Sequence, residues 1–71
     1  MVSPNPVLDM IYINSEKSAT ATLFDISGKE LISQKVVNGK NSIDVSLLEG
    51  GYYLLQLTKG NERLVKKLII K

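Results

Sequence analysis

The sequence predicts a small all-β domain, namely an antiparallel β-sandwich of six short strands, or of seven if one of them divides. Short segments alternate apolar with polar residues, which is the period of a strand that buries one face. Residues that favour turns separate these segments at intervals of about eight to twelve residues, the spacing of small sandwiches. Because 71 residues suit one domain, residues 1–71 are expected to fold as a unit, with 1–3 as an added start or a linker end.

The first two strands are expected between residues 10 and 24. In the Pro-Asn-Pro sequence at 4–6, both prolines lack a backbone N–H and the second restricts the asparagine to extended conformations, so the sequence disfavours a helix and leads into a strand. Apolar and polar residues then alternate over 10–14 and again over 19–24, where threonines occupy the more solvated face. The polar segment 15–18 would form the turn between these two strands.

Turn residues delimit the next two strands. Asp25 and Gly28 occupy the first and fourth positions favoured in a type I turn, which would reverse the chain into a third strand over 29–37. The Asn-Gly pair at 38–39 is the strongest short hairpin signal that a sequence offers. It predicts a hairpin between the third strand and a fourth over 42–48.

A corner precedes the fifth strand, which is expected over 52–57. Leu48, Gly51 and Tyr53 have the spacing of a tyrosine corner, in which a tyrosine hydroxyl bonds back to the backbone across the sandwich. Gly51 would let the chain turn tightly because it lacks a Cβ atom. Such a corner stabilises a fold and carries no chemistry of its own.

The last segment, 63–71, can be interpreted in two ways. Leu64, Val65, Leu68 and Ile69 would share one face of a basic amphipathic helix, which would indicate a membrane surface or a groove-binding partner. The segment is short for an isolated helix, has no capping box and is rich in residues that favour strands. A sixth strand is therefore favoured, and the whole sandwich is expected to be immunoglobulin-like.

Positive charge gathers at the C-terminal end of the chain. The net charge is +2, yet residues 1–58 contain four lysines against six acidic residues, whereas 59–71 contain five basic residues against Glu62 alone. Such a segment indicates an anionic partner, or a soluble edge strand that lysines protect from aggregation. The basic patch is small, so charge alone favours the second interpretation.

Residues that carry chemistry are sparse. The absence of histidine and cysteine removes the usual general base, disulfides and thiolate metal ligands. Asp9, Asp25 and Asp44 could pair in a glycosidase or bind calcium, but no calcium-loop spacing occurs, and each suits a turn, the start of a strand or an exposed strand position. No catalytic residue, cofactor or metal is expected, and nucleic-acid binding, a signal peptide and a membrane span are not indicated.

Taken in order, these motifs resemble the type A C-terminal sorting domain of the type IX (Por) secretion system of Bacteroidetes. The resemblance extends from Pro4 to Lys71 and depends on DISGKEL at 25–31, IDVSLLEGGYYLLQL at 43–57 and KKLIIK at 66–71, besides the Pro-Asn-Pro sequence. The family's structural motifs match Pro4, Asn5, Pro6, Asp25, Gly28, Leu48, Gly51 and Tyr53. The end that the secretion machinery would recognise matches Lys66, Lys67, Leu68, Ile69, Ile70 and Lys71.

This resemblance implies a folded label, not an enzyme, fused to the C-terminus of a cargo such as a protease, glycosidase or adhesin. The label would be recognised in the periplasm by shuttle proteins and the outer-membrane translocon, and the cargo would reach the cell surface or the medium. A sortase-like surface peptidase would remove the label, and the cargo could be attached to an anionic lipopolysaccharide. The resemblance implies no nucleic acid and no direct membrane insertion, while a weak edge-to-edge dimer is compatible with the terminal strand.

Two other functions stay open from the residues alone. Tyr12 and Tyr52 could form a stacking platform in a carbohydrate-binding or adhesive module of an extracellular enzyme. A purely structural spacer would also fit, and its deletion would leave the location of the parent protein unchanged.

Overall fold

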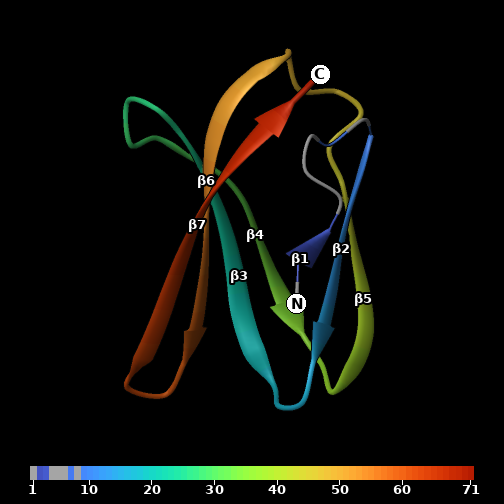
Figure 1. Ribbon diagram of the computed structural model, residues 1–71. Helices are drawn as coiled ribbons and strands as arrows, with labels where there is room; N and C mark the ends of the chain where they lie inside the picture. The colour runs from blue at the N-terminus through green and yellow to red at the C-terminus, as the bar shows by residue number, and fades with distance from the viewer. Residues whose placement is uncertain (1, 4–6, 8) are drawn as a thin grey trace.

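The computed structural model describes residues 2–3, 7 and 9–71, which form two antiparallel sheets packed face to face (Figure 1). One sheet has the strand order β1-β2-β5 and the other β4-β3-β6-β7. No helix occurs among the described residues, so the predicted all-β sandwich is confirmed and an immunoglobulin-like arrangement is compatible with it. The strands are β1 (Val2–Ser3), β2 (Met10–Ser15), β3 (Ala19–Asp25), β4 (Glu30–Val36), β5 (Gly39–Asp44), β6 (Gly51–Lys59) and β7 (Glu62–Ile70).

The hydrophobic core lies between the two sheets and follows from the alternation along each strand. Ile11 and Ile13 point inward from β2, and Tyr53, Leu55 and Leu57 do so from β6, each at most 8% exposed. Burying an aliphatic side chain of this size contributes about 1.5–3 kcal/mol to folding. The remaining core side chains are Val7, Ala21, Leu23, Val36, Ile43, Val45, Leu68 and Ile70.

β6 and β7 form a long hairpin at one edge of the four-stranded sheet. Nine residues of each strand pair in continuous register, from Gly51 opposite Ile70 to Lys59 opposite Glu62. The helical interpretation of the last segment is therefore wrong. Among the described residues, no helix is long and apolar enough to cross a membrane.

The predicted hairpin at the Asn-Gly pair 38–39 is wrong. β4 pairs with β3 and β5 pairs with β2, so this connection carries the chain from one sheet to the other. β5 also ends at Asp44, earlier than the expected strand over 42–48. Gly39 adopts a φ of 108°, a conformation that suits glycine. The dipeptide thus locates a glycine-dependent bend, while burial of both strands in different sheets decides their partners.

The side chain of Asn41 holds this crossover together. Its carboxamide oxygen accepts a hydrogen bond from the Val37 N–H at 2.9 Å. Its amide nitrogen donates to the carbonyl oxygens of Val37 at 2.9 Å, Gly39 at 3.1 Å and Ile13 at 3.3 Å. One side chain therefore joins the connecting loop to β5 and to the neighbouring strand β2. This role of Asn41 is not predictable from the sequence, because its partners are known only once the sheets are assembled.

Val7 joins the C-terminal end of β7 through backbone hydrogen bonds. The Val7 N–H donates to the Ile69 carbonyl at 2.7 Å, and the Lys71 N–H donates to the Val7 carbonyl at 2.8 Å. These bonds form a parallel bridge between Val7 and Ile70, and the Val7 side chain is fully buried. The Pro-Asn-Pro sequence at 4–6, predicted to lead into a strand, lies outside the described residues.

Candidate recognition surface

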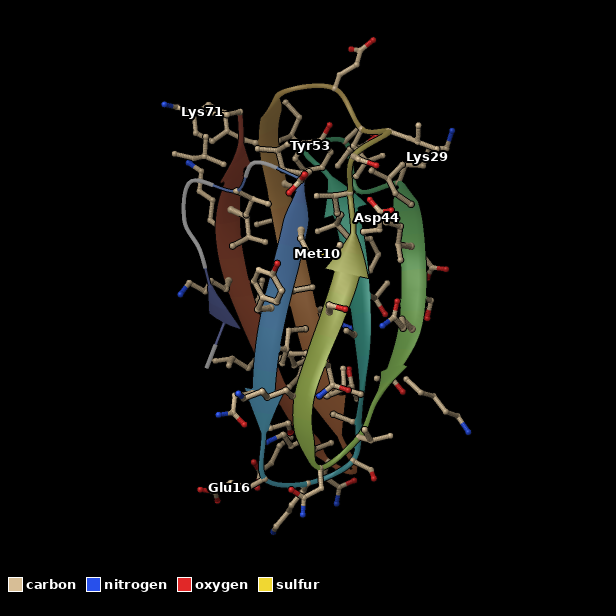
Figure 2. The ribbon with its side chains drawn as sticks, turned by 90° about the vertical axis from the view of Figure 1, so that its right-hand side faces the viewer. Met10, Glu16, Lys29, Asp44, Tyr53 and Lys71 are labelled. Carbon is tan, nitrogen blue, oxygen red and sulfur yellow. The ribbon has the colours of Figure 1, made fainter. Side chains whose placement is uncertain are left out.

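The six residues predicted to contact a secretion machinery occupy the end of β7 and the terminal lysine. Figure 2 shows Lys71 and Tyr53 at one end of the molecule and Glu16 at the other. The six residues do not form one surface, because inward and outward positions alternate along the strand. Lys66, Lys67, Ile69 and Lys71 are exposed, whereas Leu68 and Ile70 are buried in the core.

An apolar patch covers the outer face of the β6–β7 hairpin. We define this outer patch as Tyr52, Leu54, Val65 and Ile69, whose side chains are 53%, 37%, 52% and 40% exposed. The register places Tyr52 opposite Ile69 and Leu54 opposite Lys67. The Lys67 Nζ atom lies 4.6 Å from the centroid of the Tyr52 ring, which is a cation–π contact. Apolar patches with charged neighbours are typical of interaction sites on proteins.

The outer patch is not among the features predicted from the sequence, although the last strand contains a signal for it. Apolar residues occupy the consecutive positions 64–65 and 68–70, so they face both sides of β7. A strand with one solvated face would instead alternate apolar with polar residues. Only the position of β7 at a sheet edge, in register with β6, shows that the second apolar face meets solvent.

Tyr53 makes the hydrogen bond that defines a tyrosine corner. Its hydroxyl donates to the backbone carbonyl of Glu49, four residues upstream. Leu48 packs against the core beside it. Gly51 has a φ of 153°, which L side chains rarely adopt, so the corner depends on a glycine at this position. The corner holds the start of β6, and thereby the strand that carries β7.

Asp25 serves a turn. The Gly28 N–H donates to the Asp25 carbonyl at 3.0 Å, and one carboxylate oxygen of Asp25 accepts three further bonds. These come from the Ser27 hydroxyl at 2.6 Å, the Ser27 N–H at 2.9 Å and the Lys29 N–H at 3.0 Å. The bond from the Ser27 hydroxyl, followed by that from the Lys29 N–H, lowers the pKa of Asp25 below its ordinary value.

The other two aspartates also make local contacts. The Asp44 carboxylate accepts a bond from the Ser46 N–H at 2.9 Å, and bonds from the Ser46 side chain and backbone lower the pKa of Asp44. The Asp9 backbone carbonyl accepts a bond from the Val45 N–H at 2.9 Å. Within the described ranges, no group of three histidine, cysteine, aspartate or glutamate side chains could hold a metal ion.

The two tyrosines considered as a sugar platform lie on different sheets. Tyr12 alternates with the inward Ile11 and Ile13 of β2, so it faces outward from the three-stranded sheet. Tyr52 precedes the inward Tyr53 of β6, so it faces outward from the four-stranded sheet. Because the outer faces of a sandwich point in opposite directions, these two rings cannot stack on one sugar chain.

This chain is similar to known proteins, and each similarity covers a small part of the other protein's length. The chain is 35% identical over 68 residues to a funoran endo-beta-hydrolase from Wenyingzhuangia aestuarii, with 90% of this chain and 9% of that protein covered. It is 32% identical over 69 residues to beta-agarase D from Zobellia galactanivorans, with 97% of this chain and 14% of that protein covered. The chain thus spans about a tenth of the length of these relatives.

A known protein family matches this chain over its whole length, in agreement with the fold and the motifs. Residues 1–71 match the family described as the secretion system C-terminal sorting domain. This match covers both sheets, the corner at Tyr53 and the exposed end of β7. The chain belongs to the family of secretion system C-terminal sorting domains, and the predicted resemblance to the type IX sorting domain is confirmed.

Proposed function

We propose that the secretion machinery recognises this sorting domain as a folded sandwich, through the outer patch and the basic end of β7. The observation that carries the proposal is the concentration of exposed apolar and basic side chains on one edge strand of a domain without a metal cluster in its described part. Sorting domains of this family mark a fused protein for export, so a contact surface is what the function requires.

The partners that we propose follow from this role. The domain would follow a cargo in the same polypeptide, and the cargo would be an enzyme, as the names of the two relatives suggest, that acts outside the cell. Shuttle proteins and the outer-membrane translocon of the type IX system would bind the label in the periplasm. A sortase-like surface peptidase would then release the cargo, for which the label is a substrate and not a catalyst.

Export of a reporter tests this proposal. A fluorescent protein with residues 3–71 at its C-terminus, behind a signal peptide, is expected to reach the surface or medium of a type IX-competent bacterium. A translocon-deficient strain should retain it in the periplasm. Retention in both strains would overturn the proposal and favour a purely structural spacer.

A double charge-reversal variant tests whether the basic end of β7 belongs to the recognition surface. Lys66→Glu/Lys67→Glu should stay folded and be exported at least about tenfold less, because both side chains are exposed and a charged contact would become repulsive. The matched control is Lys35→Glu/Lys40→Glu, which changes the same charge at exposed positions of β4 and β5. Equal export of both variants would remove the basic end from the mechanism.

A further inference from the structure

One edge of β7 faces away from its partner strand β6. The Ile69 carbonyl and the Lys71 N–H both bond to Val7, on the side of β7 away from β6. Because the N–H and C=O groups of alternate residues point to the same edge, those of Arg63, Val65 and Lys67 share this side. Within the described ranges, no backbone bond joins these three residues to another strand at that edge. β1 pairs with β2 in the other sheet, and no backbone bond between β1 and β7 occurs among the described residues.

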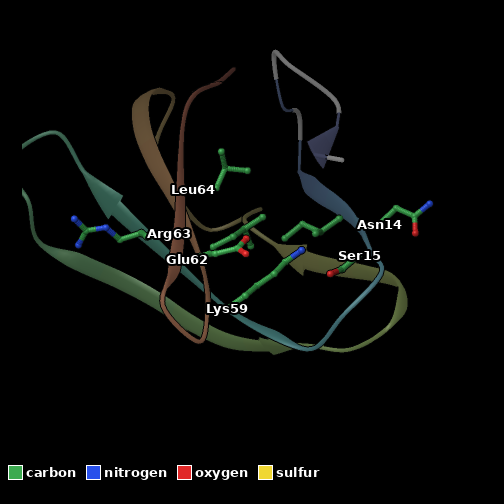
Figure 3. A pocket seen from close by; sticks show the side chains of 8 residues that line it. Asn14, Ser15, Lys59, Glu62, Arg63 and Leu64 are labelled. Carbon is green, nitrogen blue, oxygen red and sulfur yellow. The ribbon is translucent and has the colours of Figure 1, made fainter.

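A cleft opens beside the same part of β7, between the start of β7 and the end of β2 (Figure 3). We call it the edge cleft. Its volume is about 530 Å³; its apolar lining includes Ile13, Leu57 and Leu64, and Lys59 and Glu62 are among its polar residues. Figure 3 shows Lys59 extending across the opening toward Ser15 of β2.

Leu64 lies where the space between the two sheets is open to solvent. It lies on the same face of β7 as the buried Leu68 and Ile70, since the three are separated by even numbers of residues. Leu68 is fully buried, yet Leu64 is 61% exposed and lines the edge cleft. An inward-facing leucine with an exposed surface has room for a further side chain above it.

The charges along residues 63–67 of β7, which we call the free edge, indicate which kind of molecule could bind there. Arg63 and Lys67 flank Val65 on the outer face, and Lys66 follows on the inner face, against Glu62 alone at the start of the strand. A second copy of this chain in an antiparallel pairing centred between Arg63 and Lys67 would set these cations against each other, which is unfavourable. An extended segment that carries carboxylates at alternate positions would instead oppose each cation.

We propose that the free edge of β7, residues 63–67, binds an extended acidic peptide segment as an added strand. The backbone of the segment bonds to Arg63, Val65 and Lys67, an apolar side chain enters the edge cleft over Leu64, and carboxylates lie beside the cations of the outer face. Strand addition to a sheet edge is a general mode of peptide recognition. The identity of the segment as part of the export machinery rests on the proposed function, whereas the binding mode does not.

Titration of the 71-residue chain with a synthetic peptide tests the proposal by NMR and amide exchange. The probe is a blocked seven-residue peptide of alternating Glu and Val. The expected result is a shift of the amide signals of Arg63, Val65 and Lys67, with exchange slowed at least about tenfold at these sites. Two control peptides are the same sequence with every second amide N-methylated and the same pattern with Lys in place of Glu, and neither should bind.

Two protein variants separate strand addition from general charge attraction. Val65→Pro removes an N–H that does not face β6 and should weaken binding at least about tenfold, while Val65→Thr keeps the N–H and should bind within about twofold of the parent chain. Leu64→Ser should weaken binding about threefold or more through the cleft, without the risk of misfolding that Pro carries.

Several outcomes would overturn the proposal. Equal binding of the N-methylated peptide would reduce it to charge attraction, and signal changes confined to other strands would place the site elsewhere. Concentration-dependent shifts of the same amides without peptide would assign the edge to a second copy. Reporter export that fails while the peptide still binds would overturn the proposed function alone, and the reverse result would overturn this inference alone.

Discussion

The two sides of the sandwich at which the sheets end differ in how the two layers are joined. On one side, β4 and β5 are edge strands of different sheets, and the chain itself crosses between them. Gln34 Nε2 donates to the Ser42 carbonyl at 2.9 Å, and Asn41 joins the crossover loop to two strands. On the other side, backbone hydrogen bonds between described residues join β7 to a segment outside its own sheet only at Val7, near the C-terminal end of β7.

This difference indicates that the fold itself leaves the surface of β7 exposed. An edge strand is a site of unwanted pairing, and lysines are a common protection against it. β7 carries such cations, yet it also exposes Leu64 on one face and Val65 and Ile69 on the other. Cations repel a second copy of the strand and leave the edge accessible to an acidic partner, so one feature serves solubility and recognition together.

The largest expected effect compares two leucines on the same face of β7. Leu68→Ala should lower the free energy of unfolding by about 3 kcal/mol, because the side chain is fully buried and its removal leaves a cavity. Leu64→Ala should lower it by less than about 0.5 kcal/mol, since that side chain is mostly exposed. Urea unfolding curves measure both values. A large loss of unfolding free energy in Leu64→Ala would show that the start of β7 is covered in solution and would contradict the open edge.

An intermediate effect is expected on the closed side. Asn41→Ala should lower the free energy of unfolding by about 2 kcal/mol, because it removes a side chain that bonds to Val37, Gly39 and Ile13. Amide exchange should accelerate in β5 and in the crossover loop and stay unchanged in β7. Asn38→Ala at the neighbouring exposed position is the control and should have little effect. Uniform acceleration over both sides would contradict the view that they are held independently.

The smallest effect concerns pH and lies in the turn between β3 and β4, away from both sides. The folded state lowers the pKa of Asp25 below its ordinary value of 3.8, mainly through the Ser27 hydroxyl. Its contribution to stability is therefore complete above pH 3.8 and is lost as the pH falls through the lower folded-state pKa. Unfolding curves between neutral and acid pH should show a smaller acid loss for Asp25→Asn than for the parent chain, with Asp44→Asn as a second, similar case. An identical acid loss in the Asp25 variant would contradict the assignment.

Much of the local structure could be predicted from short-range chemistry. Alternation placed Ile11, Ile13 and Tyr53 on inward faces, because strand geometry alone sends neighbouring side chains to opposite sides. The turn at Asp25 and the corner bond of Tyr53 involve partners within four residues, so the sequence contains both sides of each interaction. The family resemblance likewise rests on motifs that are contiguous in the chain.

What the sequence alone determined is therefore the all-β class, the positions of most strands and turns, and the family. The tertiary structure decided which strands pair, since the Asn-Gly bend at 38–39 suits either a hairpin or a crossover and only burial of β4 and β5 in different sheets selects between them. It also decided the surface: Leu64 and Leu68 have the same residue type and the same face, yet Leu64 lines an open cleft and Leu68 is buried in the core. Exposure depends on distant residues that pack above a side chain, and no local pattern contains them.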